Sequence, residues 1–222
     1  MIGGVAPAGR WWHAVLLKVY ESLTRRDVAA PADLIFVMAG RMERKCYGLE
    51  LYRASLAPQL VLSVGRFEVS KMHKVGLANA LVEELIALRD KTQPDERHFF
   101  VKLDPSGISI EKRILPRWNT YGEILGLKHF LEAGTVRRVM VVSTDVHLRR
   151  VALTCARVFR SAPVEFLYCP TPSRFGSLRK DGWWTRPDDR RFVIKEMMKL
   201  AGYGVILSMP ASASRRLMRL KD

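Results

Sequence analysis

The chain has 222 residues and carries 37 Lys and Arg against 22 Asp and Glu, which gives a formal net charge of +15. Apolar residues make up 48% of the chain and charged residues 27%, a balance that excludes a disordered chain and is typical of a globular domain. The longest apolar run, residues 34–40, is far shorter than the roughly 20 residues that span a bilayer. Nothing basic precedes Arg10 and no long apolar segment follows the start, so no secretory signal is expected.

The three cysteines are an odd number and lie far apart, at Cys46, Cys155 and Cys169. This pattern excludes a disulfide framework and predicts free thiols in a reducing compartment.

The first 32 residues contain a candidate helix, Trp11 to Leu23, with apolar side chains on one face and basic residues on its flanks. We expect it either to pack on the following domain or to lie on a membrane surface.

Residues 33–207 alternate short apolar runs with amphipathic stretches. Strands are predicted at 33–38, 59–63, 98–102 with 107–110, 138–143 and 164–168. Helices are predicted at 43–55, 76–89, 121–132 and 147–159. Alternation with short links predicts an open three-layer α/β sandwich with a mostly parallel central sheet of about five strands.

A long segment, Cys169 to Pro187, follows the last predicted strand. It is rich in Pro, Gly, Ser and Arg and contains Trp183 and Trp184. A loop of this length is often either functional or mobile. Asp188 and Asp189 are then predicted to cap a helix that runs to about residue 207, and a basic tail follows at 208–222.

In an open parallel sheet, ligands bind beyond the carboxyl ends of the strands. The predicted ligand-binding residues stand just after strands or just before helices: Gly40, Arg41, Ser63, Gly65, Arg66, Asn119, Thr120, Thr144, Asp145 and Arg150. Small residues allow close backbone approach, and cations beside helix N-termini suit a phosphate or carboxylate. Each also has a structural interpretation, as a turn glycine, an N-cap or a solvated surface residue.

Three side chains are candidates for catalysis. His147 is the best proton donor or acceptor near neutral pH, and Glu111 or Glu123 would act as a base or orient the cations. The sequence contains no dinucleotide fingerprint, P-loop, zinc spacing or nucleophile elbow, so we assign no metal and leave the cofactor unknown.

Several of these segments resemble the YdcF/SanA/ElyC-type family, a bacterial family long described as a domain of unknown function. The resemblance covers residues 33–204 and rests on the first strand with Gly40, the Asn119-Thr120 pair and the Ser143–Arg150 segment with its His-x-x-Arg spacing. It implies a Rossmann-like fold and a role in cell-envelope or peptidoglycan metabolism, without an established reaction. With no spanning segment, the expected location is the cytoplasm or the periphery of the inner membrane.

The sequence thus predicts a protein that binds a small phosphate-bearing or nucleotide-like molecule, with enzymatic activity left open. One alternative is binding to nucleic acid or an anionic membrane through the basic surface. Its cations would be Arg215, Arg216 and Arg219 in the tail and those around Trp183 and Trp184, whose rings could stack on bases. Another is a non-catalytic envelope assembly factor.

Overall fold

The structure, a computed structural model, describes residues 8–65, 67–96, 98–113, 120–132, 134–176 and 178–210. Its elements are α1 (Ala8–Ser22), β1 (Leu34–Val37), α2 (Met42–Arg53), β2 (Gln59–Gly65), η1 (Val69–Val75), α3 (Asn79–Lys91), η2 (Pro94–Glu96), β3 (His98–Asp104), β4 (Gly107–Lys112), α4 (Thr120–Leu131), β5 (Arg138–Ser143), α5 (Asp145–Val158), β6 (Glu165–Pro170) and α6 (Pro187–Ser208). Every predicted strand and helix is present, with its ends moved by a few residues.

The six strands form one sheet in the order β4-β3-β2-β1-β5-β6. The β1 strand is central and pairs in parallel with β2 and β5, and β5 pairs in parallel with β6. The third-strand region forms two strands, because a tight turn between Asp104 and Gly107 folds β4 back along β3. Five strands therefore run in one direction and only β3 is reversed. The predicted α/β class with a mostly parallel sheet is confirmed, with six strands.

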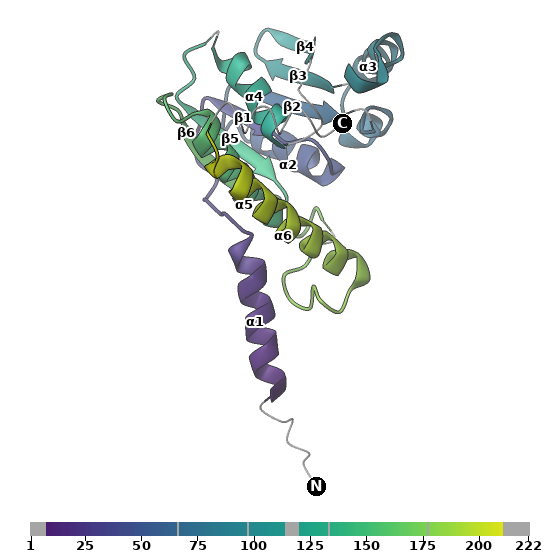
Figure 1. Cartoon of the computed structure of the whole chain (residues 1–222). Coiled ribbons are helices and arrows are strands. Elements are labelled where there is room, and N and C mark those ends of the chain that lie inside the picture. The colour runs from purple at the N-terminus through teal and green to yellow at the C-terminus, as the bar shows by residue number, and fades with distance from the viewer. Residues whose placement is uncertain are drawn as a thin grey trace.

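Helices cover both faces of this sheet (Figure 1). On one face Ile35 and Val37 of β1 pack with apolar residues of α2, η1 and α3, while on the other Leu34 and Phe36 pack with those of α4 and α5. Burial on both faces explains why β1 is a continuous apolar run instead of an alternating one. The three-layer sandwich follows from these two cores.

The α6 helix packs outside α5, and a third apolar cluster joins α5 and α6 to α1. In this cluster Tyr20 and Trp183 are buried, and Trp183 Nε1 donates a hydrogen bond to the Leu16 carbonyl at 3.1 Å. The first turns of α1 project away from the sandwich (Figure 1), where Trp11 and Trp12 are exposed. The carboxyl half of α1 therefore packs on the domain.

The start of α6 differs from the predicted cap. The helix begins at Pro187 with Arg186 as its N-cap residue and without a side-chain cap hydrogen bond. Asp189 instead accepts a hydrogen bond from Arg186 Nε. Arg186 thereby ties the start of α6 to the preceding loop.

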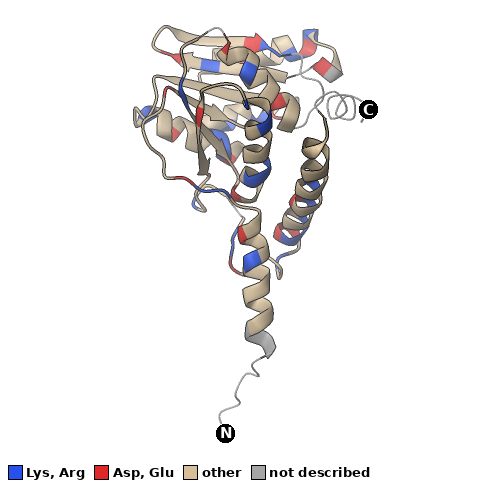
Figure 2. Ribbon diagram, turned by 60° about the vertical axis from the view of Figure 1, so that its left-hand side comes forward, with Lys and Arg blue, Asp and Glu red and all other residues tan. Residues whose placement is uncertain are grey.

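Figure 2 shows Lys and Arg distributed over the sheet, the helices and the loops, with acidic residues among them. No helix among the described residues is long and apolar enough to cross a membrane. All three cysteines are free thiols, as predicted.

Candidate functional site

A pocket of about 650 Å³ lies at the carboxyl edge of the sheet. We call it the edge pocket; it is lined by Ala39, Gly40, Arg41, Arg44, Gly65, Phe67, Glu68, His98, Thr120, Glu123, His147, Arg150, Phe192, Glu196, Lys199 and Tyr203. These residues come from the ends of β1 and β2, the reversed start of β3, and the first turns of α2, α4 and α5, with α6 closing one side. The topology thus gathers ionisable side chains from distant parts of the chain at one edge.

One hydrogen-bonded chain links α6, α5 and α4. Arg150 Nη2 donates to Glu196 Oε2 at 2.8 Å, and Arg150 Nη1 donates to Thr120 Oγ1. Thr120 Oγ1 lies 3.1 Å from His147 Nε2, and His147 Nδ1 lies 2.8 Å from Ser143 Oγ. The His147 ring is therefore held by a hydroxyl on each nitrogen.

The partners of His147 determine its protonation. Burial, followed by the positive charges of Arg150, Arg44 and Lys199, holds the pKa of His147 well below its usual value. Burial and these cations therefore favour a neutral imidazole at His147, with Nε2 facing Thr120 and Nδ1 facing Ser143.

A second group of charges fixes the turn after β1. The backbone N–H groups of Ala39 and Gly40 donate to the carboxylates of Glu123 and Glu68, respectively. Gly40 has φ +124°, a left-handed conformation that favours glycine. The Gly40 N–H predicted to approach a ligand is therefore engaged by Glu68, and a ligand would meet side chains first.

Arg44 and Lys45 complete this group from the first turn of α2. Arg44 donates to the Ala39 carbonyl and, over 3.0 Å, to Thr144 Oγ1, while Lys45 pairs with Glu68. Both cations are buried, yet Arg44 Nε has no hydrogen-bond partner among the described residues.

Burial shifts the proton affinities of two groups here. It raises the pKa of Glu123, against the hydrogen bonds from the Ala39 N–H and Ser63 and the charge of Arg44. It lowers the pKa of Arg44, against the attraction of Glu123, Glu68 and Glu196. The edge pocket therefore holds a carboxyl that retains its proton to higher pH than an exposed Glu and an imidazole that loses its proton at lower pH than an exposed His.

The edge pocket brings together seven of the predicted site residues: Gly40, Arg41, Gly65, Thr120, Glu123, His147 and Arg150. Ser63 is fully buried behind it, with its Oγ 2.7 Å from His98 Nε2. Thr144 and Asp145 line an adjoining cavity of about 800 Å³, which we call the loop pocket because most of its walls are residues between 170 and 186.

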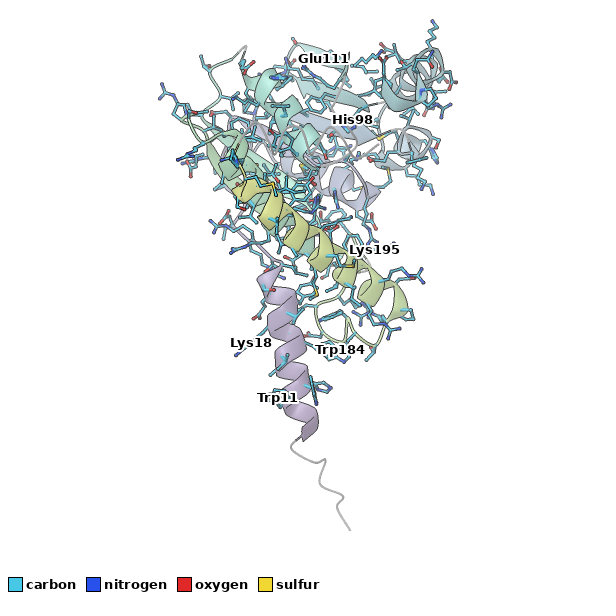
Figure 3. All side chains as sticks on the ribbon, viewed as in Figure 1. Trp11, Lys18, His98, Glu111, Trp184 and Lys195 are labelled. Atoms are coloured by element: carbon cyan, nitrogen blue, oxygen red, sulfur yellow. The ribbon has the colours of Figure 1, made fainter. Side chains whose placement is uncertain are left out.

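The remaining predicted residues do not join the edge pocket. Glu111 lies on β4, the strand at the edge of the sheet, and pairs with Arg113 (Figure 3). Its register partner is Phe100 on β3, so its place in the hairpin and its ion pair keep it out of the pocket. Arg66 and Asn119 lie outside the described residues.

Several pocket residues were not among the predicted site residues, because the prediction considered positions that directly follow parallel strands. His98 is at the edge because β3 is reversed, so that the start of this strand lies beside Gly65. Glu68 depends on the position of η1, and Lys199 depends on how α6 packs. For Arg44 a signal did exist, because it is in the first turn of the helix that follows Gly40.

In comparisons with known proteins, no family model matches this chain significantly, and no curated protein or solved structure does either. The resemblance to the YdcF/SanA/ElyC-type family therefore stays a prediction. Among the described residues, no group of three or more His, Cys, Asp or Glu side chains could hold a metal ion.

Proposed function

We propose that the edge pocket binds a small phosphate-bearing or nucleotide-like molecule. The observation that carries this proposal is the pair of guanidinium groups that line the pocket, Arg44 and Arg150. Guanidinium groups suit phosphate geometry.

Acid–base chemistry on the bound molecule is supported by two groups whose environments shift their pKa values in opposite directions. Burial and nearby cations favour the neutral form of His147, which suits a proton acceptor. Burial favours the protonated form of Glu123, which suits a proton donor. Such a pair is the pattern from which acid and base roles are assigned in enzymes. Binding without turnover would instead fit a non-catalytic factor.

The nucleic-acid alternative loses one of its features. The Trp183 side chain is 4% exposed and packs against α1, so it offers no open face to a base. Trp11 and Trp12 remain exposed on α1, so contact of this helix with a membrane surface stays a prediction.

A thermal-shift screen tests the proposal. The compounds are inorganic phosphate, nucleotides, sugar nucleotides, S-adenosylmethionine and polyprenyl phosphates. An envelope role would favour the sugar nucleotides and the polyprenyl phosphates. We expect at least one phosphate-bearing compound to stabilise the protein, by about 2.7 kcal/mol at 100 times its Kd.

The variant Lys199→Gln tests whether the compound binds in the edge pocket. Lys199 lines the pocket, its side chain is 52% exposed, and its removal leaves Glu196 paired with Arg150, so the fold should persist. Lys195→Gln is the matched variant, because Lys195 is exposed on the same helix and lies outside the pocket lining (Figure 3). Stabilisation should fall in Lys199→Gln only. Equal stabilisation of both variants, or none by any phosphate-bearing compound, would overturn the proposal.

A further inference from the structure

More basic than acidic side chains line the loop pocket. It lies between the carboxyl end of α1, the start of α5 and the segment before α6, and has a volume of about 800 Å³. Three acidic residues line it, Glu43, Asp145 and Asp181. Six basic residues line it: Arg26, Arg41, Arg174, Arg179, Lys180 and Arg186. A basic side chain in such a cavity that has no acidic partner can attract an anionic ligand.

The loop pocket adjoins the edge pocket. Arg41 lines both, with its Nη2 3.1 Å from Glu43 Oε1 and its guanidinium 5.7 Å over the Phe192 ring. Thr144 lines the loop pocket, and its Oγ1 accepts the hydrogen bond from Arg44 of the edge pocket at 3.0 Å. Arg41 and Thr144 therefore lie where the two cavities meet.

The basic residues of the loop pocket divide into two kinds. Five of them are ion-paired: Arg26 with Asp145, Arg41 with Glu43, Arg174 with Glu50, Lys180 with Glu21, and Arg186 with Asp189. Arg186 also donates to the carbonyls of Arg179 and Asp181, so these paired residues build the walls. The Arg179 side chain is different: it has no ion pair or hydrogen bond within the described part of the chain, and the residue is exposed. Its guanidinium is available to a ligand.

We propose that the loop pocket binds the second anionic group of an extended ligand whose first phosphate lies in the edge pocket. The ligand class is a molecule with linked anionic groups, such as a nucleoside or sugar diphosphate. This inference rests on the proposed function of the edge pocket. Arg179 contributes the charge that selects the extended molecule over a single phosphate, and Arg41 lies where the two halves meet.

Calorimetric titration with two probes, inorganic phosphate and inorganic triphosphate, tests the inference. The variant Arg179→Gln should weaken triphosphate binding about fivefold to twentyfold, the effect of losing one charge-assisted contact, and change phosphate binding less than twofold. Arg191→Gln makes the same change of charge at an exposed arginine outside both pockets, and should alter neither affinity.

The variant Lys199→Gln distinguishes the two proposals. It should weaken both probes, because Lys199 lines the edge pocket that both would occupy. Phosphate binding that is the same in Lys199→Gln and the wild type overturns the proposed function. Triphosphate binding that is the same in Arg179→Gln and Arg191→Gln overturns the further inference alone. Triphosphate binding that depends on Arg179 and ignores Lys199 also overturns it, because the two pockets would then bind separately.

Discussion

At the scale of residues, the carboxyl edge of the sheet is unusual for the charges that it buries. The ionisable residues there that are at most 7% exposed are Arg44, Lys45, Glu68, His98, Glu123, His147, Arg150 and Glu196. Buried charges are stable only when they are paired and hydrogen-bonded, and removing one partner of such a pair costs about 3–5 kcal/mol. This is why half-exposed Lys199 and exposed Arg179 are the better positions for binding variants.

The two buried imidazoles predict how stability depends on pH. Burial lowers the pKa of His98 from its usual 6.5 to about 4, and the pKa of His147 is also lowered. Both histidines stay neutral in the folded protein at pH values where the unfolded chain takes up protons. The folded state is therefore favoured above pH 6.5 and loses stability as the pH falls below it, by up to about 1.4 kcal/mol per pH unit for each histidine.

The variant His98→Asn isolates one of these contributions. Between pH 7 and pH 5 its free energy of unfolding, measured with urea, should fall by about 2 kcal/mol less than that of the wild type. His129→Asn, at an exposed position near the end of α4, serves as the control. A pH dependence in His98→Asn that equals the wild type's would contradict the account of His98.

At the scale of elements, the approach of α2 to β1 depends on one glycine. A Cβ added to Gly48 would lie 2.3 Å from Val37 Cγ2, which is too close for two non-bonded carbon atoms. The contact matters for the site, because α2 carries Arg44 and β1 leads into the Ala39-Gly40 turn. Close packing at Gly48 therefore helps to position the edge pocket.

Substitution of this glycine tests the contact. Gly48→Ala should lower the free energy of unfolding by about 1–3 kcal/mol through overpacking. The matched variant is Gly202→Ala in α6, where nothing lies within 4 Å of an added Cβ. It should raise the free energy of unfolding by about 0.5–1 kcal/mol, because alanine is the better helix former. Denaturant unfolding of the two variants would contradict this account if both changed stability in the same direction.

The sequence predicted the burial of the strands better than it predicted their directions. The continuous apolar run of β1 indicated a strand buried on both faces, and the structure confirms that. The direction of β3 left no such signal, because antiparallel and parallel strands in a buried sheet share the same apolar pattern. The antiparallel pairing of β3 with β2 brings His98 to the edge, and the short turn after β3 then puts Glu111 on the edge strand β4.

At the scale of the whole molecule, the candidate site was predictable where local rules apply. Thr120, His147 and Arg150 were expected together because the ends of parallel strands and the starts of the next helices share one edge, and hydrogen bonds do join them. Glu196 and Lys199 depend on packing of α6 against α5, a long-range contact that no local pattern specifies.

The net charge of +15 also has a clearer distribution at this scale. Six basic residues line the loop pocket, and Lys and Arg are also distributed over the sheet, the helices and the loops (Figure 2). Part of the surplus, including that of the basic tail, lies outside the described residues. Under the further inference, the long segment before α6 forms part of the wall of the proposed site.

The most direct test of the central claim follows the His147 imidazole by NMR during a titration with inorganic phosphate. His147 lines the edge pocket, whereas His129 lies near the other end of α4 and is exposed. The signals of the five histidines can be assigned with single variants such as His147→Gln and His129→Asn. We predict that saturating phosphate shifts the His147 resonances and leaves those of His129 in place. Phosphate binding that leaves the His147 resonances unmoved would contradict the account.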